Sequence, residues 1–290
     1  MRTLHILSIA LLALCINCPG RQKSECGLLS GTRKSDVFLQ GFYWNSTPGG
    51  LWWDSLGRIA PQLASAGFGA VWFPAPTKGA AGSLSMGYDI YDHYDFGEYN
   101  QKGSVETRFG SRQELSNAIA AYHANGIEVF ADAVMGHMNG GELKAPYECK
   151  PYPSYPDSGY LLFSYPGGSG RFRKNASHFY PNNQTCDVNP PYHGPSDIAF
   201  KFGEYLAHAQ SRVKDSLIEW GKYLRQALGF DGFRIDEAKS IDPIFAGPWI
   251  AQADSGGYAV AEYFGSTPEI QTWLYYCNTV FGGHASNLRH

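Results

Sequence analysis

Apolar residues gather into short runs along the chain, and these runs are rich in β-branched and aromatic side chains. Five of them stand out, at 36–42, 69–74, 127–133, 230–236 and 258–262. Runs of this length predict β-strands, and their near-continuous apolar character predicts strands that are covered on both faces. We expect a sixth strand at 279–281.

Segments with apolar residues at helical spacing lie between these runs and predict helices. Three of these predicted helices have recognisable ends. Ser111 and Glu114 form a capping-box pattern ahead of one helix. Apolar residues recur at helical spacing from 213 to 228, and Gly229 follows where a helix commonly ends. A third helix is expected to begin at Ser266. The chain therefore alternates strands and helices, which predicts a parallel sheet covered by helices.

Two α/β architectures fit this alternation, a doubly wound open sheet and a (β/α)8 TIM barrel. No predicted strand is followed by the glycine fingerprint or the P-loop of a nucleotide-binding doubly wound fold. Asp132, Asp236 and Glu262 instead lie at the carboxyl ends of three predicted strands. A barrel collects its active residues at such ends, so the pattern favours the barrel.

One connection is too long for an ordinary loop. Residues 138–197 are rich in Tyr, Pro, Gly and Asn and show no helical period. A segment of this kind predicts a small irregular domain inserted after the third strand. We therefore expect 36–137 to form the first part of the barrel and 198–290 to continue it. A closed barrel needs eight strands, so we expect the barrel to be incomplete at its C-terminus.

The N-terminus predicts export. Arg2 precedes an apolar stretch, 6–16, that is too short to span a bilayer. This pattern is typical of a signal peptide, which we place at 1–20, and it predicts a secreted, extracellular protein. A lipoprotein leader, acylated at Cys15 or Cys18, is the alternative that the sequence leaves open. After removal of the leader, nothing in the sequence predicts association with a membrane.

Export would place the remaining cysteines in an oxidising environment, where they can pair. Cys149 and Cys186 bracket one irregular segment, and we predict a disulfide between them. The sequence does not decide whether Cys26 and Cys277 are paired or free.

Composition excludes several classes of protein. The formal net charge of −3, without a basic run, gives no footprint for nucleic acid. Outside the leader, neither a metalloprotease HExxH motif nor a nucleophile-elbow GxSxG motif is present, so metalloprotease and esterase functions lack support. Aromatic residues make up 15% of the chain, which suits sugar binding and core packing equally and decides between neither.

The strand-end carboxylates suggest glycosidic chemistry. Side chains alternate along a strand, so Arg234 and Asp236 share a face, and an adjacent arginine should keep Asp236 ionised. Glu262 ends the next strand, close enough for two carboxyl groups to flank one bond. Crowding between the two carboxyl groups should leave Glu262 protonated and ready to act as an acid. A structural ion pair and a solvated glutamate are the alternative interpretations.

Several segments together resemble one known family. ADAVMGH, GFRIDEAKS and AEY, in this order on the third, fourth and fifth predicted strands, look like short conserved segments of the α-amylase family. The stretches VWFPAPTKG, MGYDIYDHYDFGEYNQKG and TRFGS are similar to liquefying-type bacterial amylases and, more distantly, to plant amylases. The resemblance covers most of 36–275 and is thinnest between 142 and 210. It implies a glycoside hydrolase built on a TIM barrel.

The resemblance also implies roles for the strand-end residues. Asp236 matches the nucleophile of the family and Glu262 its proton donor. Arg234 matches the arginine that orients the nucleophile, and Asp132 a carboxylate that supports this arginine.

Three further residues match positions that bind substrate in the family. Tyr88 matches a tyrosine that stacks under the sugar at the cleavage subsite, and His137 a histidine that contacts the same sugar. Lys239 matches a lysine on the leaving-group side.

The family resemblance implies a calcium ion, and this sequence departs from the pattern around it. Asp187 looks like a calcium ligand that ties the insert to the barrel. Gly136 stands where many members carry an asparagine ligand, so one ligand is lost. Ser240 stands where a histidine is common, so a substrate contact is lost.

The function implied by the resemblance is endo-hydrolysis of α-1,4-glucosidic bonds in starch or glycogen, with retention of configuration. The partner would be an α-glucan, and we expect a monomer. The third catalytic carboxylate of the family is not found through His290, so we expect the 290-residue chain alone to be inactive. A transglycosylase or α-glucosidase of the same family, a non-catalytic glucan-binding relative and a purely structural extracellular domain remain as alternatives.

Overall fold

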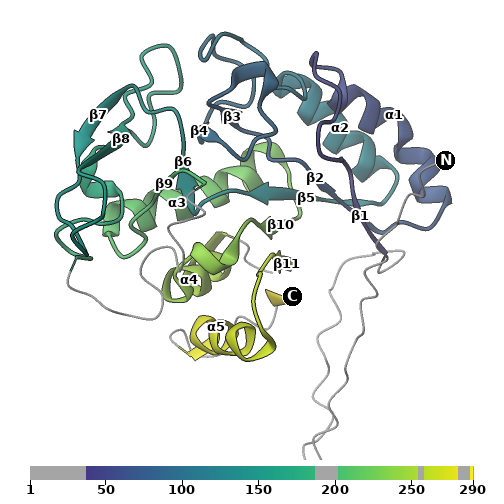
Figure 1. Ribbon diagram of the computed structural model, residues 1–290. Coiled ribbons are helices and arrows are strands. Elements are labelled where there is room, and N and C mark those ends of the chain that lie inside the picture. Colours follow the sequence, from purple (N-terminus) through teal and green to yellow (C-terminus); the bar gives the residue numbers. More distant parts are fainter. Residues whose placement is uncertain (1–36, 187–201, 254–257, 280–287, 290) are drawn as a thin grey trace, which may run out of the picture. The chain divides into compact units, whose positions relative to one another are not determined.

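A computed structural model of the protein describes residues 37–186, 202–253, 258–279 and 288–289. Six parallel strands form its main sheet (Figure 1), in the order β1 (Phe38–Gln40), β2 (Ala70–Phe73), β5 (Glu128–Ala133), β10 (Gly232–Ile235), β11 (Tyr258–Ala261) and β12 (Leu288–Arg289). Each strand therefore pairs with the next sheet strand along the chain. A doubly wound sheet would reverse its strand order near the middle, so this order is that of a (β/α) barrel wall, and the predicted fold class is confirmed.

Helices connect successive strands of the sheet. They are α1 (Trp52–Ser65), α2 (Arg112–Ala124), α3 (Ser211–Tyr223), α4 (Pro243–Ala253) and α5 (Thr267–Thr279). The capping box predicted from the sequence opens α2, because Ser111 and Glu114 each accept a hydrogen bond from the other's backbone N–H. The helix α3 continues through a π-helical turn at Leu224–Leu228 and ends at Gly229, whose φ of +87° favours glycine. Figure 1 shows α1 and α2 side by side.

Aromatic side chains fix these helices against the sheet. Phe73 of β2 packs against Trp53 of α1 with ring centroids 5.4 Å apart, and against Tyr122 of α2 at 5.2 Å. Trp249 of α4 packs on Phe233 of β10 at 4.7 Å. All five rings are almost completely buried. Burial of such large apolar surfaces is the main source of stability here, and it holds the strand ends that carry the site in place.

The long connection after β5 carries structure of its own. The short strands β6 (His137–Met138) and β9 (Glu204–Tyr205) pair antiparallel, so the beginning and the end of the excursion lie together. Between them, β7 (Leu143–Pro146) and β8 (Ser158–Leu162) form a hairpin. The loop after β2 holds a second small ladder, β3 (Lys78–Gly79) with β4 (Ile90–Asp92). Short 3₁₀ turns are η1 (Gly82–Leu84), η2 (Ala176–His178) and η5 (Ala238–Ser240).

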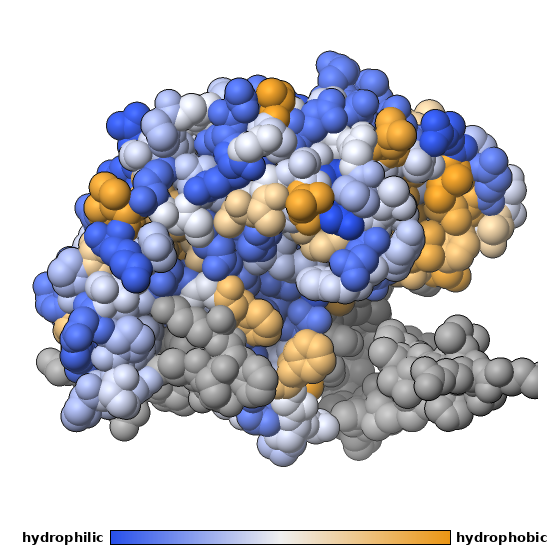
Figure 2. All heavy atoms as spheres, turned by 45° about the horizontal axis from the view of Figure 1, so that its top comes forward, coloured by the Kyte–Doolittle hydropathy of each residue, from blue (hydrophilic) through white to orange (hydrophobic). Residues whose placement is uncertain are grey.

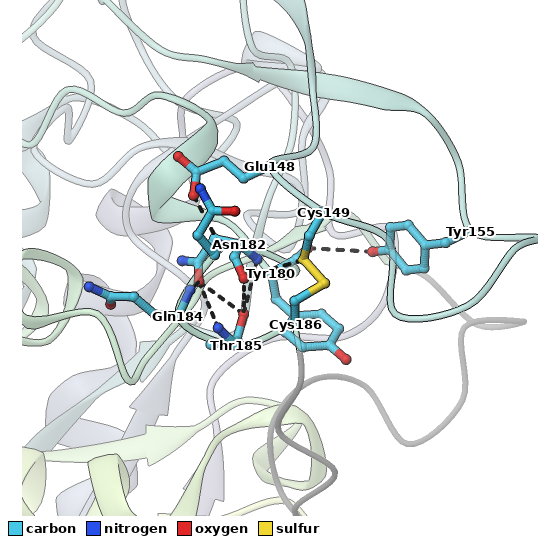
Figure 3. The surroundings of a disulfide bond; sticks show 9 residues. Glu148, Cys149, Tyr155, Tyr180, Asn182, Gln184, Thr185 and Cys186 are labelled. Atoms are coloured by element: carbon cyan, nitrogen blue, oxygen red, sulfur yellow. Dashed lines mark hydrogen bonds between the residues drawn. A yellow bond between two sulfur atoms is a disulfide. The ribbon is translucent and has the colours of Figure 1, made fainter.

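The predicted disulfide between Cys149 and Cys186 is present (Figure 3). It closes residues 149–186, a part of the excursion that contains β8 and η2. Beside it, Asn182 and Thr185 hold a tight turn, in which the backbone N–H of Thr185 donates to the Asn182 carbonyl at 2.9 Å. Cys277 is free and buried, whereas Cys26 lies outside the described residues.

The sixth strand lies later in the chain than the sequence predicted. Thr279 is the last residue of α5, and residues 280–281 lie outside the described part. The strand that pairs with β11 is β12, with Leu288 beside Ala259. At Thr279 the prediction was wrong, because α5 extends through this residue. The capping interactions between Ser266 and Glu269 start it, and the buried Trp273 and Cys277 continue its apolar face.

The predicted signal peptide at 1–20 lies outside the described residues. Within the described residues, no helix has both the length and the apolar character that crossing a membrane requires. Hydrophilic residues cover most of the surface shown in Figure 2, where apolar residues are mostly scattered and one larger group lies at the right edge. Scattered apolar residues are normal for a protein surface and need no partner to explain them.

Candidate active site

The carboxyl ends of β5, β10 and β11 meet at one edge of the sheet, and each carries an acidic residue. Arg234 of β10 lies beside Asp132 of β5 in the strand register. Asp236 follows directly after β10, and Glu262 directly after β11. Because side chains alternate along a strand, Arg234 and Asp236 point to the same face. The strand pairing thus brings one basic and three acidic residues to the same place.

Arg234 is the centre of this group. Its Nη1 lies 2.7 Å from Asp132 Oδ1 and 2.7 Å from Asp236 Oδ1. Its Nη2 lies 2.5 Å from Glu262 Oε2. The guanidinium also stacks over the ring of Trp72, 4.6 Å from its centroid. One planar guanidinium therefore holds Asp236 and Glu262 on its two terminal nitrogens, a fixed arrangement that a flexible lysine would not provide.

The carboxyl groups differ in burial. Asp132 and Asp236 are almost fully buried, whereas the side chain of Glu262 is 33% exposed. Burial raises the pKa of Asp236 to about 8; the charges of Asp132 and Glu262 add to this rise, and Arg234 opposes it. Burial also raises the pKa of Asp132, again against Arg234. Burial and the two neighbouring carboxyl groups therefore oppose the ionisation of Asp236 that Arg234 was expected to maintain. Both shifts are in the direction of a coupled group that holds a proton more strongly than isolated carboxyl groups do.

Tyr88 extends the cluster toward the opening of the pocket. Its hydroxyl donates to Asp132 Oδ2 at 2.7 Å, and burial raises its pKa, so the hydroxyl remains a donor. Trp44 stacks on Tyr88 with ring centroids 5.8 Å apart. His137 Nε2 lies 2.7 Å from the Tyr88 carbonyl oxygen, so the imidazole donates there. Burial lowers the pKa of His137, and its Nδ1 has no hydrogen-bond partner among the described residues. The neutral ring thus has one nitrogen, Nδ1, that is buried and has no hydrogen-bond partner among these residues.

Lys239 lines the same pocket but has a partner elsewhere. Its Nζ lies 3.3 Å from Glu269 Oε1, near the start of α5. Its side chain is 32% exposed. The ammonium group is therefore directed toward α5 and lies apart from the Arg234 cluster.

These residues surround a pocket of about 590 Å³. Its aromatic lining consists of Phe42, Trp44, Trp72, Tyr88, Phe202 and Phe264. Trp44, Phe202 and Phe264 are more than half exposed, so rings stand at the opening as well as at the base. Such a pocket presents apolar faces around a few fixed polar groups, which suits a sugar ring.

Sequence reasoning assigned no substrate contact to Trp44, Phe202, Phe264 or Glu237, all of which line the pocket. Two of them follow strand ends that had been identified: Glu237 comes directly after Asp236, and Phe264 comes two residues after Glu262. Their place after a barrel strand was the available signal. Trp44 and Phe202 lie in irregular segments, where no periodic pattern predicts which way a side chain faces.

The predicted calcium site cannot be assembled from the described residues. Asp187 lies outside them. Gly136 offers no side chain, and a Cβ there would lie only 2.8 Å from Ser240 Oγ. The Gly136 carbonyl already accepts a hydrogen bond from Leu206 N at 3.0 Å. Among the described residues, no three His, Cys, Asp or Glu side chains form a group that could hold a metal ion. The surroundings of Gly136 therefore fit calcium poorly, and calcium stays a prediction.

Comparison with known proteins gives a consistent answer. Residues 62–288 match the family model of the α-amylase catalytic domain. The chain is 32% identical to a glucan 1,4-α-maltohexaosidase from Bacillus sp. (strain 707), over 79% of this chain and 50% of that protein. It is 28% identical to an α-amylase from Geobacillus stearothermophilus, over 90% of this chain and 52% of the relative. The chain thus spans about half the length of these relatives.

Solved structures agree at the level of the fold. An α-amylase from Geobacillus thermoleovorans, solved with acarbose, matches with a TM-score of 0.54 and 16% identity, over 85% of this chain and 50% of that one. A cyclomaltodextrinase matches with a TM-score of 0.51 and 19% identity, over 85% of this chain and 38% of that one. The family model, the sequence relatives and the shared barrel architecture together show that the chain belongs to the α-amylase family of glycoside hydrolases.

Proposed function

We propose that the protein hydrolyses internal α-1,4-glucosidic bonds of starch- or glycogen-type polysaccharides and retains the configuration at the anomeric carbon. The observation that supports this most is the position of Asp236 and Glu262, which lie on the two terminal nitrogens of Arg234. Retaining glycosidases need two carboxyl groups about 5–5.5 Å apart, on either side of one bond. Relatives named for their action on 1,4-α-glucans support the choice of linkage.

In the proposed reaction, Asp236 attacks the anomeric carbon while Glu262 donates a proton to the leaving oxygen. This forms a covalent glycosyl–Asp236 intermediate and releases the first product. Glu262, now ionised, then takes a proton from a water molecule, which attacks the same carbon and frees Asp236. Arg234 holds both carboxyl groups in position throughout, because it contacts each of them.

The proton in the cluster has to be on Glu262 when the bond breaks. A glycosidic oxygen beside Glu262 would accept a hydrogen bond from its protonated form, and this contact favours the proton on Glu262. Asp236 can then ionise against Arg234. Substrate binding would thus place on Glu262 the proton that the buried cluster holds.

The pocket offers matching contacts for a glucose ring. The ring of Tyr88 lies beside the carboxyl cluster and would contact the sugar that becomes attached to Asp236, and His137 lines the same pocket. The outer rings of Trp44, Phe202 and Phe264 would contact neighbouring sugars of a longer chain. An endo-acting enzyme requires such contacts on both sides of the cleaved bond.

Substitution of the two carboxyl groups tests the proposal. Asp236→Asn and Glu262→Gln, made in the full-length protein, should each lower the rate of starch cleavage by at least about 10³-fold. Asp215→Asn and Glu219→Gln, two exposed positions on α3, are matched controls and should leave the rate unchanged. Proton NMR of the first products should show the α-anomer. Near-wild-type cleavage by both active-site variants would contradict the proposal.

We also propose that the protein is secreted. The pattern at 1–20 predicts export, and the Cys149–Cys186 disulfide supports an oxidising destination. Fractionation of the producing cells, followed by detection of the protein in the medium, would test this.

A further inference from the structure

Glu237 is an acidic side chain of the pocket that the proposed reaction does not use. It follows Asp236 and lines the pocket beside Lys239 and Ser240. Its backbone has a φ of +41°, in the left-handed region that a residue with a Cβ enters only at a cost in free energy. Backbone strain of this kind persists where the surrounding structure enforces it, and it is frequent at ligand sites.

The turn that carries Glu237 is built on Glu262. The backbone N–H of Ala238 donates to the Glu262 carbonyl oxygen at 2.7 Å. The backbone N–H of Glu237 donates to Glu262 Oε2 at 3.3 Å. Glu237 is therefore fixed relative to the proposed acid, whereas Tyr88 is fixed to Asp132 on the other side of Arg234.

Only one of the two carboxyl oxygens of Glu237 has a hydrogen-bond partner among the described residues. Its Oε2 accepts a hydrogen bond from Ser240 Oγ at 2.6 Å. Within the described part of the chain, no donor contacts Oε1. Burial and the charge of Glu262 raise the pKa of Glu237, whereas the bond from Ser240 opposes this rise. A partly buried oxygen without a partner gains from a donor that a ligand brings.

We infer that Glu237 determines specificity on the leaving-group side, where its Oε1 accepts a hydrogen bond from a hydroxyl group of the departing sugar. The inference rests on the proposed function, because it takes Glu262 as the group that protonates the leaving oxygen. A residue tied to Glu262 lies beside the sugar on that side of the bond. Ser240 keeps the carboxyl group turned toward the pocket. Glu237 would thus recognise a leaving group that carries several hydroxyl groups, and it would not recognise a small leaving group without them.

Two substrates that differ only in their leaving group test this role. Cleavage of maltopentaose releases a sugar that carries hydroxyl groups. Cleavage of α-maltotriosyl fluoride releases fluoride, which carries none. In the full-length protein, Glu237→Ala should lower kcat/KM for maltopentaose by about tenfold to a hundredfold. For the fluoride it should change kcat/KM by no more than about twofold. Glu237→Gln preserves the size of the side chain and should show the same pattern with a smaller loss.

Ser240→Ala removes the tether of Glu237 and should lower kcat/KM for maltopentaose selectively, by less than Glu237→Ala does. Glu219→Gln, exposed on α3, is the matched control and should change neither value. Equal losses on both substrates would overturn the inference, because Glu237 would then act through Asp236 or Glu262. Unchanged values on both would overturn it as well. A wild-type protein that cleaves neither compound would instead remove the proposed function on which the inference rests.

Discussion

Arg234 and Lys78 are both buried cations, and the two regions around them differ in the balance of charge. Lys78 is fully buried, and its Nζ lies near Asp95 Oδ2 at 3.5 Å. The rest of its shell consists of backbone carbonyls, those of Tyr99, Ser104, Val105 and Glu106. Arg234 faces three carboxyl groups at the edge of an open pocket.

This difference in charge balance distinguishes a structural site, at Lys78, from a chemically reactive one, at Arg234. Around Lys78, the cation contacts one carboxylate and neutral oxygens in a site closed to solvent, and the second buried carboxylate nearby, Asp92, is linked to Asp95 through Gln101 Nε2. Around Arg234, the carboxyl groups outnumber the cation, and the cluster must retain a proton or bear excess negative charge. That excess lies where a substrate can reach it. We therefore expect changes at Arg234 to affect the reaction and changes at Lys78 to affect stability.

The largest effect is expected at Arg234. Arg234→Lys keeps the charge but cannot contact Asp236 and Glu262 on two nitrogens at once. Starch cleavage should fall by about 10²-fold or more, because two charge-assisted hydrogen bonds are disturbed. The thermal midpoint should change far less than the rate. A variant that keeps wild-type activity would show that the guanidinium does not position the carboxyl groups.

Lys78→Met should have the opposite profile. It leaves Asp95 buried without its cation, which costs about 3–5 kcal/mol of unfolding free energy. The thermal midpoint should fall by roughly 10 °C, measured by calorimetry, while the protein that remains folded keeps its kcat. Adding Asp95→Asn should restore part of the lost stability. Full stability in the single variant would mean that the pair contributes little.

The proton retained at Asp236 predicts a pH-dependent stability. The pKa of Asp236 is raised above its unfolded value to about 8, so the group favours the folded state at low pH. This contribution is lost as the pH rises from about 4 through about 8. Asp236→Asn cannot ionise, so its thermal midpoint relative to wild type should rise across this window, by roughly 10 °C. A difference that does not vary with pH would contradict the raised pKa.

Removal of calcium is expected to have the smallest effect. Gly136 provides no side-chain ligand, and Ser240 Oγ lies near the space that such a ligand would occupy. Chelation with EDTA should lower the thermal midpoint by no more than about 2 °C. A larger drop that added calcium reverses would point to ligands outside the described residues, with Asp187 as the first to substitute.

The sequence predicted the sheet and its acidic edge because those features depend on short-range patterns. Apolar runs indicated the strands, and the alternation of side chains placed Arg234 and Asp236 on one face. The helix α4 was not identified, because it is apolar on nearly all sides and contains Pro248, so it shows no helical period. Thr279 was assigned to a strand because short apolar runs do not distinguish strand from helix.

The missing parts of the site depend on long-range contacts or on irregular backbone. Glu237 enters the pocket through a left-handed turn, which side-chain alternation cannot predict. Trp44 and Phe202 reach the pocket from irregular segments that are far in the chain from Asp236. The proton on the cluster follows from burial of Asp236, and burial at a strand end is set by the whole fold.

The most direct test of the account is to trap the covalent intermediate. Glu262→Gln should react with α-maltotriosyl fluoride, because fluoride leaves without acid assistance, and the intermediate should accumulate because no base activates water. Mass spectrometry of the digested protein should then find a maltotriosyl group on Asp236. A maltotriosyl group on any other residue would show that Asp236 is not the nucleophile.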